Sequence, residues 1–445
     1  MKRKIDAFLL EWKNKKDHLP LIVKGARQIG KTYSIVDFAK KNYKNFIEIN
    51  FSTNEEFLSI FSDGYDVNSI IKNISLIRPD SNFEKGDTLI FFDEIQLCSK
   101  GMASLKQFKL DGRFDVICSG SLMGINYNEI QLNSVGYKED YDMYSMDFEE
   151  FLWAIGYSDK QIIDILDHMI QQTPFSDLEM KIYKNVFFDY LIIGGMPAIV
   201  SKYIENKNFS GILQMQKQLL SDYEEDITKY AKGIEKGKIL NVYRNIPYFL
   251  GKESKRYQIT KIKSNARNRD YVGALEWLSN AGIINVCYCL NEPELPLVGN
   301  YDLSKYKIYF SDTGLLIASL DDESQTDLRE NKNFNTFKGA IYESIASETL
   351  IKAGYKLFYY KDEHSQIEMD FFVRGKDNLI PIEVKAKDGA TISLNNLITK
   401  EKYKEVKFGI KFGDKNIGFN GKFYTFPYFT MFLLRRFIKT LDCND

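Results

Sequence analysis

The sequence predicts an α/β protein with a parallel sheet, and four stretches carry this prediction. Residues 25–32 have the G-x-x-x-x-G-K-[ST] spacing of a phosphate-binding loop. The apolar run at 19–23 is typical of a buried strand, and residues 33–39 are typical of a helix that leaves the loop. A second apolar run at 88–92 predicts a strand buried on both faces, which ends in Asp93 and Glu94.

Each part of the loop has a chemical role in this interpretation. The glycines allow successive N–H groups to face a β-phosphate at the positive end of the following helix. Lys31 would reach the β- and γ-phosphates, and the Thr32 hydroxyl would bind Mg²⁺. We therefore expect ATP and Mg²⁺ as ligands, against the alternative of a chance glycine-rich turn. The expected nucleotide-binding residues of the loop are Gly25, Ala26, Arg27, Gln28, Ile29, Gly30, Lys31 and Thr32.

Length and composition limit the class of protein. A chain of 445 residues suits about three domains, and 44% hydrophobic with 27% charged residues is typical of a soluble globular protein. No apolar run reaches membrane-spanning length, and residues 1–6 lack a secretion-type apolar segment. The odd number of cysteines, five, favours a reducing compartment over a disulfide framework. We therefore expect a cytoplasmic protein without a membrane partner.

The charge distribution is uneven along the chain. The net charge is −1, but residues 331–445 carry about +5 and residues 1–330 about −6. A basic C-terminal part is a weak indication of a polyanionic partner, since lysine-rich surfaces also keep proteins in solution.

Two further strands complete the expected N-terminal sheet. Residues 45–51 alternate as a strand, and residues 114–118 form another before a Ser-Gly-Ser turn. At the carboxyl edge, Asp93 would hold Mg²⁺ through water and Glu94 would polarise the attacking water. Ser119 is the first candidate to sense the γ-phosphate and Ser121 the second; a turn without a special role stays open.

These features resemble the core of an AAA+ ATPase. Residues 25–32, 92–96 (Phe-Asp-Glu-Ile-Gln), 119–121, 146–152 (Met-Asp-Phe-Glu-Glu-Phe-Leu) and 194–197 (Gly-Gly-Met-Pro) resemble a group of poorly characterised prokaryotic AAA ATPases. The resemblance covers nearly the whole chain. It implies an AAA+ core at 1–147, a helical lid at 148–241, a winged helix at 242–330 and a restriction-endonuclease-like α/β domain at 331–445.

One position departs from this group. Relatives often carry Gly-Arg before the strand that leads into the Phe-Glu-Glu-Phe segment, where the arginine is a candidate arginine finger. Here the sequence is Gly136-Tyr137-Lys138, and lysine lacks the bidentate fork of arginine. The oligomeric state therefore stays open, with a homo-oligomer among the alternatives.

The middle of the chain is expected to be largely helical. The Gly-Gly-Met-Pro stretch at 194–197 interrupts the lid helices, either as a hinge or as an ordinary turn. Residues 257–290 suggest a helix, a turn, a helix ending at Gly282 and a strand, which resembles a winged helix. Such a domain can bind DNA or serve only as a protein contact, and both alternatives stay open here. In the DNA interpretation the phosphate contacts are Lys261, Lys263, Arg267 and Arg269.

A second set of chemical residues follows residue 335. A helix containing Glu343 precedes three strands, at 355–360, 369–373 and 379–385. Asp370 and Glu383 lie on two of these strands, and Lys385 shares a strand face with Glu383. Two converging carboxylates can hold Mg²⁺, and Lys385 would stabilise the attacking hydroxide or the developing phosphate charge.

This set, completed by Glu343, resembles the PD-(D/E)xK nucleases, with spacing similar to archaeal Holliday-junction resolvases. Met369 stands where many members have proline. An active nuclease, a DNA-binding domain with little or no activity, and a structural pair of charged strands remain as alternatives. For the whole chain we expect an ATPase coupled to a DNA-binding nuclease-like domain. The alternative is a signalling or scaffold ATPase that binds a protein partner and carries an inert C-terminal domain.

Overall fold

A computed structural model describes residues 1–121, 136–231, 233–252, 255–258, 261, 267–330, 336–365, 367–386, 389 and 391–444. The chain divides into two compact units, Met1–Ser145 with Asn280–Gly282, and Met146–Ser279 with Ile283–Asp445. The expected lid, winged helix and C-terminal domain all fall in the second unit. Part of the expected winged helix, including Lys263, lies outside the described residues.

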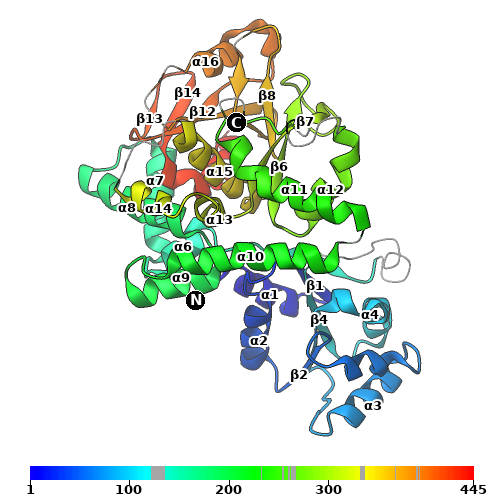
Figure 1. The fold of residues 1–445 in the computed structure, drawn as a ribbon. Coiled ribbons are helices and arrows are strands. Elements are labelled where there is room, and N and C mark those ends of the chain that lie inside the picture. The colour runs from blue at the N-terminus through cyan, green and yellow to red at the C-terminus, as the bar shows by residue number, and fades with distance from the viewer. Residues whose placement is uncertain are drawn as a thin grey trace. The chain divides into compact units, whose positions relative to one another are not determined.

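The first unit contains a five-stranded parallel sheet in the order β2-β3-β4-β1-β5 (Figure 1). The expected α/β fold with a parallel sheet is confirmed. The strands are β1 (Leu21–Lys24), β2 (Asn45–Asn50), β3 (Thr88–Asp93), β4 (Asp115–Gly120) and β5 (Glu139–Asp142). The helices are α1 (Lys4–Asn14), α2 (Lys31–Asn42), η1 (Glu55–Phe61), α3 (Val67–Ile77), η2 (Ile95–Leu97) and α4 (Ser99–Asp111).

Helices cover both faces of this sheet. Helix α2 lies on one side of the strands, and α3 and α4 lie on the other (Figure 1). Apolar side chains of α3 and α4, such as Ile70 and Leu105, pack against Ile90 and Phe92 of β3. All six residues of β3 are buried, as a strand in the middle of a covered parallel sheet requires. Because β3 ends at Asp93, this residue lies at the carboxyl edge of the sheet, next to the loop that follows β1.

The second unit begins with helices that carry two of the recognised motifs. Asp147 and Glu150 form a capping box at the start of α6, and Gly194 ends α8 with φ of +72°. The helices are α6 (Phe148–Ala154), α7 (Asp159–Gln171), α8 (Asp177–Ile193), α9 (Pro197–Asn206), α10 (Ile212–Tyr230), α11 (Gly233–Leu250), η4 (Asn268–Tyr271) and α12 (Val272–Asn280).

Gly195 lies at a close approach of two chain segments. Its N–H donates to Asp312 Oδ2 (2.8 Å), and its carbonyl oxygen accepts from the N–H of Met146 (2.7 Å). A Cβ at Gly195 would lie 1.9 Å from the carbonyl oxygen of Met146, so no larger residue fits. The Gly-Gly-Met-Pro stretch is therefore a tight, hydrogen-bonded turn between α8 and α9.

Two sheets form the rest of the second unit. One has the order β7-β6-β8-β9 and the other β10-β11-β12-β14-β13. The strands are β6 (Ile284–Leu290), β7 (Tyr301–Phe310), β8 (Phe358–Lys361), β9 (Glu368–Met369), β10 (Phe371–Arg374), β11 (Leu379–Val384), β12 (Gly409–Gly413), β13 (Gly418–Phe419) and β14 (Phe423–Pro427). The remaining helices are α13 (Thr313–Ala318), α14 (Ser324–Arg329), α15 (Thr336–Lys352), α16 (Ile392–Thr399), η5 (Glu401–Tyr403), η6 (Tyr428–Leu433) and α17 (Leu434–Asn444).

The four-stranded sheet joins segments that the sequence assigned to different domains. Strand β6 pairs with β7 in antiparallel and with β8 in parallel orientation. Because β6 precedes residue 330 and β8 follows it, one hydrogen-bonded sheet crosses the expected domain boundary. Side chains of β7 are thereby brought next to α15 and β10.

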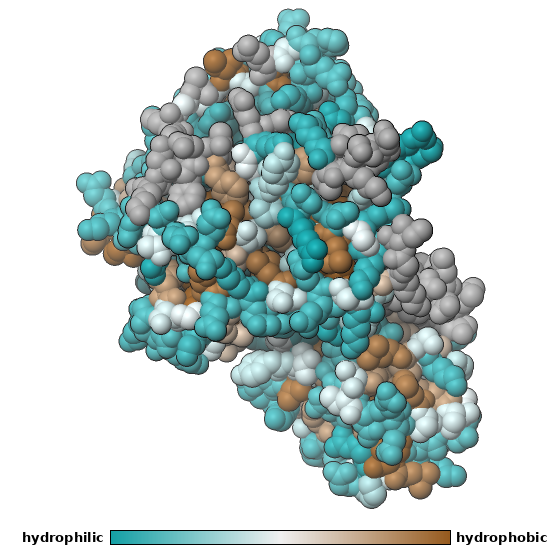
Figure 2. Space-filling model, in the orientation of Figure 1, coloured by the Kyte–Doolittle hydropathy of each residue, from teal (hydrophilic) through white to brown (hydrophobic). Residues whose placement is uncertain are grey.

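No helix in the described part of the chain combines the length and apolarity needed to cross a bilayer. On the face shown in Figure 2, apolar residues form separate patches among hydrophilic ones.

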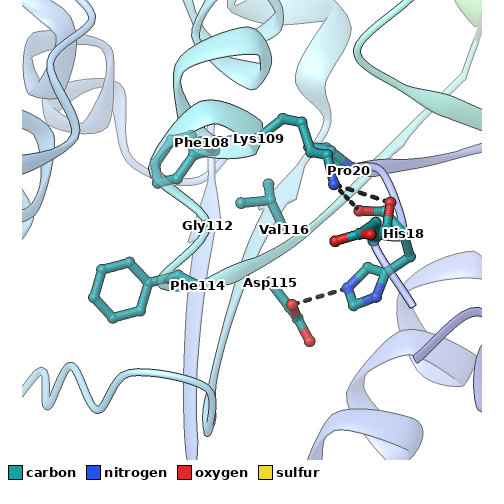
Figure 3. Close-up of a pocket in the computed structure, with 9 residues that line it drawn as sticks. His18, Pro20, Phe108, Lys109, Gly112, Phe114, Asp115 and Val116 are labelled. Carbon is teal, nitrogen blue, oxygen red and sulfur yellow. Dashed lines mark hydrogen bonds and ion pairs between the residues drawn. The ribbon is translucent and has the colours of Figure 1, made fainter. Parts of the chain in front are cut away.

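A cavity of about 280 Å³ lies at the amino edge of the first unit's sheet, where β1 and β4 begin (Figure 3). His18 Nε2 is 2.9 Å from Asp115 Oδ1, and Tyr43 donates to Asp115 Oδ2 (2.6 Å). Lys109 donates to the carbonyl oxygens of Asp17 and His18, at 2.9 and 3.0 Å. The hydrogen bond to Asp115 raises the pKa of His18. Burial alone would raise the pKa of Asp115, but its hydrogen bonds with His18 and Tyr43 outweigh this effect, and the pKa is lowered.

The substitution Gly195→Ala should lower the free energy of unfolding by about 2–3 kcal/mol, because the new methyl group overlaps a backbone oxygen. Gly237→Ala is the matched control. Gly237 lies exposed inside α11 with open space around its Cα, so this change should be neutral or stabilise by up to about 1 kcal/mol. Urea unfolding followed by circular dichroism measures both. Equal stability of the two variants would show that the turn tolerates a side chain.

The variant His18→Gln should be less stable than the parent by about 1–2 kcal/mol at pH 5.5 and by clearly less at pH 8.5. A raised histidine pKa stabilises the fold below the unfolded value of 6.5, and this contribution is lost as the pH rises through the folded value. Urea titrations at both pH values measure the difference, with exposed His364→Gln as the control. A stability difference independent of pH would contradict the charged pair.

Candidate functional site

The loop after β1 contains three residues in backbone conformations that favour glycine. Gly25, Gln28 and Gly30 have φ of +147°, +64° and +91°, and α2 begins directly after Gly30. A Cβ at Gly25 would lie 2.2 Å from the carbonyl oxygen of Met143, so the close approach requires glycine here. The loop thus leads directly into the N-terminus of α2, where an anion is favoured.

The loop lysine is buried inside this turn. Lys31 is 8% exposed and donates to the carbonyl oxygens of Gly25 (3.0 Å) and Ala26 (2.6 Å). Burial lowers its pKa to about 8, although Glu94 and Asp93 act in the opposite direction. The ammonium group of Lys31 therefore lies against the loop backbone. A phosphate bound there would replace part of the solvation that burial removes.

Several hydrogen-bond donors of the site contact the carboxylate of Asp93. Its Oδ2 accepts hydrogen bonds from Thr32 Oγ1 (3.1 Å) and Asn50 Nδ2 (3.0 Å). Its Oδ1 accepts from Ser119 Oγ and from the N–H of Glu94 (3.0 Å). Four donors from α2, β2, β4 and the end of β3 fix one buried carboxylate. The structure thus brings Thr32, Asp93 and Ser119 together, as the sequence predicted for a Mg²⁺-nucleotide site.

Glu94 follows in the left-handed conformation, with φ of +55°. Its Oε2 accepts a hydrogen bond from Gln96 Nε2 and lies 4.0 Å from a guanidinium nitrogen of Arg27. Gln96 Nε2 also lies 3.3 Å from Ser121 Oγ. The two candidate serines therefore differ in position, since Ser119 contacts Asp93 and Ser121 contacts the glutamine that holds Glu94.

Two basic residues of the first unit have structural partners. Arg3, before α1, donates to the carbonyl oxygens of Ile29 (2.9 Å) and Tyr144 (2.8 Å) and so ties the loop to the end of β5. Lys138, at the position discussed for an arginine finger, donates to both carboxylate oxygens of Asp140 at 2.7 Å.

The four residues predicted for a second centre all lie in the second unit. Glu343 lies on α15, and Asp370 lies between β9 and β10. Glu383 lies on β11, and Lys385 follows directly after the end of that strand. Asp370 Oδ2 accepts from the N–H of Val384 (2.8 Å), which fixes it beside the end of β11. Burial and the charge of Glu343 raise the pKa of Asp370.

Glu383 is 3% exposed, and only one of its oxygens has a partner. Lys385 Nζ lies 2.8 Å from Oε1, whereas Oε2 is buried without a hydrogen-bond partner among the described residues. Burial raises the pKa of Glu383 against the effect of Lys385 and Lys411. An orphaned buried carboxylate oxygen is a place for a cation or a proton.

Glu343 has partners that sequence analysis did not identify. Its Oε1 pairs with Lys255, and its Oε2 accepts from Tyr309 (3.1 Å) and lies 3.5 Å from Lys307 Nζ. Burial alone would raise the pKa of Glu343, but Lys307 and Lys255 outweigh this and lower it. In the part of the chain that the structure describes, no three His, Cys, Asp or Glu side chains are grouped closely enough to hold a metal ion.

Some of these residues left a signal in the sequence. Asn50 ends β2 directly opposite Asp93 in the parallel register, so its contact follows from the strand order. Lys307 is a lone charge in the apolar run Tyr306–Phe310, which indicates a buried partner. Gln96 and Lys255 carry no comparable local signal.

Three family models match the chain. Residues 17–152 match one described as an AAA domain. Residues 184–326 and 338–430 match two domains of unknown function, DUF8612 and DUF4143. No curated protein matches the sequence.

Several solved structures resemble the chain in part. The Walker-type ATPase PABY2304 of Pyrococcus abyssi shares 13% identity at a TM-score of 0.43, over 72% of this chain and 95% of that one. PCH-2 of C. elegans shares 11% at 0.22, over 38% and 47%. The ORC1 protein of Aeropyrum pernix in complex with DNA shares 10% at 0.28, over 74% and 91%.

The family match and the loop geometry agree on the first unit. Residues 17–152 contain the phosphate-binding loop, the parallel sheet and the acidic end of β3 that such ATPases use. The chain therefore carries a P-loop ATPase domain of the AAA+ type.

Proposed function

We propose that the first unit binds ATP with Mg²⁺ and hydrolyses it through Lys31, Thr32, Asp93, Glu94 and Ser119. The convergence of Thr32 and Ser119 on Asp93 beside the loop is the observation that carries this proposal. A hydroxyl and a carboxylate are the hard oxygen ligands that Mg²⁺ prefers. Bound there, Mg²⁺ would neutralise charge on the β- and γ-phosphates.

The side chains and backbone groups of the site have separate roles in nucleotide binding and hydrolysis. Lys31 exchanges its two carbonyl partners for phosphate oxygens, and the loop N–H groups bind the β-phosphate. Glu94 orients the attacking water once its carboxylate leaves the Gln96 amide. Ser119 donates a hydrogen bond to Asp93 and lies on β4, so it would transmit the presence of the γ-phosphate to that strand.

We expect Lys31→Ala to weaken ATP binding at least 10-fold, because the loop loses its only ammonium donor to the phosphates. Glu94→Gln should keep ATP affinity within about 3-fold but lower kcat at least 100-fold, as loss of a general base does. A fluorescent ATP analogue measures affinity, and phosphate release measures turnover. Lys41→Ala is the control, since Lys41 lies exposed on the same helix and pairs with Asp37. A Glu94→Gln variant with the parent's kcat would remove Glu94 from catalysis.

For the second unit we propose a DNA-binding, metal-dependent nuclease-like centre formed by Glu343, Asp370, Glu383 and Lys385. The orphaned Glu383 Oε2 supports it, because a buried carboxylate oxygen with no partner suits a cation such as Mg²⁺. Asp370, which still reaches solvent in part, is the second oxygen donor beside it. Lys385 is placed to stabilise negative charge on a phosphate.

The partner proposed for this centre is DNA. Residues 331–445 carry an excess of about five positive charges, which favours a polyanion. The described basic residues of the expected winged helix, Lys261, Arg267 and Arg269, are exposed. The rate of ATP hydrolysis with and without duplex, single-stranded and branched DNA separates this proposal from the alternative of a protein-binding ATPase.

We expect the parent protein to cleave at least one of these DNA substrates with Mg²⁺ or Mn²⁺, and Asp370→Asn to abolish the cleavage. Asp377→Asn is the matched control, because Asp377 is exposed in the turn between β10 and β11. Gel assays with both variants, purified in parallel, measure the products. Equal cleavage by the parent and Asp370→Asn would assign the activity to a contaminant.

A further inference from the structure

The segment before β1 contains a histidine whose two ring nitrogens both face hydrogen-bond acceptors. His18 Nδ1 lies 3.1 Å from the carbonyl oxygen of Lys15, and Nε2 lies 2.9 Å from Asp115 Oδ1. A neutral imidazole has only one N–H, so it can donate to one of these acceptors but not to both. The doubly protonated ring donates to both. The geometry therefore favours the imidazolium form of His18, in agreement with the raised pKa of this residue.

The carboxylate of Asp115 joins three elements at the amino edge of the first unit's sheet. Asp115 begins β4, His18 precedes β1, and Tyr43 directly follows α2. His18 contacts Oδ1 of this carboxylate (Figure 3), and the hydroxyl of Tyr43 donates to Oδ2 (2.6 Å). We call these three side chains the amino-edge clamp. The clamp ties the start of β4 to the end of α2 and to the chain that enters β1.

The same three elements carry the proposed nucleotide site at their opposite ends. Strand β1 leads into the phosphate-binding loop, and Ser119 lies near the end of β4. Helix α2 begins with Lys31 and Thr32. Strands β1 and β4 pair in parallel along the whole length of β1, from Leu21 to Lys24. Because hydrogen-bonded strands and helices move as rigid elements, a change at the amino edge can alter the spacing of the groups at the carboxyl edge.

We propose that the amino-edge clamp is a proton-sensitive control of nucleotide binding in the first unit. This inference rests on the proposed binding of ATP at the loop. With His18 charged, both of its acceptors are satisfied, and the three elements are held in the arrangement that binds the nucleotide. With His18 neutral, one of its two hydrogen bonds is lost and the charge of Asp115 is no longer compensated, so the clamp loosens. Nucleotide affinity therefore falls as the pH rises through the titration of His18.

The surroundings of the clamp allow its histidine to exchange protons and to move. The side chains of His18 and Asp115 are 20% and 23% exposed, and both line the cavity of about 280 Å³ at this edge (Figure 3). Asp115 favours the charged ring, whereas Lys109 of α4 opposes it. From α1, the Trp12 ring lies 4.4 Å from the His18 ring, centre to centre. Further charged groups near the clamp are Lys13, which lies over the Tyr43 ring, Asp17 and Asp87.

The first test compares the ATP affinity of the parent and of His18→Gln at pH 5.5 and pH 8.5, with a fluorescent ATP analogue and Mg²⁺. Glutamine can donate to Asp115 but does not titrate. Lys31, with a pKa of about 8, also titrates in this range, so the ratio of the two dissociation constants is compared at each pH. We expect the parent to bind at least 5-fold more tightly than His18→Gln at pH 5.5, and within about 2-fold of it at pH 8.5.

Two further variants separate the clamp from a general effect of substitution. His364 is exposed in the second unit, so His364→Gln should bind ATP as the parent does at both pH values. Tyr43→Phe removes only the hydroxyl that donates to Asp115 and keeps the aromatic ring. We expect Tyr43→Phe to bind ATP at least 3-fold more weakly than the parent at pH 5.5, because α2 is released from the clamp. Circular dichroism confirms that each variant is folded at both pH values.

The reciprocal effect is measured on the parent protein, so it does not depend on the folding of a clamp variant. If protonation of His18 favours nucleotide binding, nucleotide binding must raise the pKa of His18 by the same free energy. The chain has three histidines, so NMR of histidine-labelled protein gives three imidazole signals. The variants His168→Gln and His364→Gln assign two of them. With a non-hydrolysable ATP analogue and Mg²⁺, the pKa of His18 should rise by about 0.7, which corresponds to the 5-fold change in affinity.

The outcomes distinguish the clamp from the ATP site itself. An affinity ratio that is equal at both pH values in the folded variants, or a His18 titration that bound nucleotide leaves unchanged, would overturn the proposal. ATP binding that depends on Lys31 would stand in either case. Absence of ATP binding by the parent at both pH values would overturn the proposed function and the clamp together.

Discussion

The carboxylate of Asp93 is the group on which the ATPase unit depends. A buried aspartate is tolerated only when its oxygens are hydrogen-bonded, and here four donors from separate elements meet both oxygens. Three of the donors lie on different elements: Thr32 is in the first turn of α2, Asn50 ends β2 and Ser119 is near the end of β4. A ligand that changed the charge beside Asp93 would therefore act on three elements at once.

The buried carboxylates of the second unit also need hydrogen-bonding or ionic partners. Its acidic residues are also buried, but ammonium groups are added to the hydroxyl and amide donors that contact them. Glu348 pairs with Lys352 and accepts from Thr313, and Glu343 pairs with Lys255 and Lys307. Pairs of this kind contribute little net stability compared with apolar packing, but the loss of one partner is costly. Such a network defines the position of each carboxylate more strongly than it stabilises the fold.

The predictable part of the structure was the part with local signals. The parallel sheet, the loop and the acidic end of β3 were predicted because a glycine pattern and two apolar runs mark them. The contact of Ser119 with Asp93 follows from strands that end at one edge of the sheet. The continuity of β6 with β8 could not be predicted, since strand pairing across a domain boundary depends on distant segments. Without that pairing, Lys307 appears in sequence only as an anomalous charge in a strand.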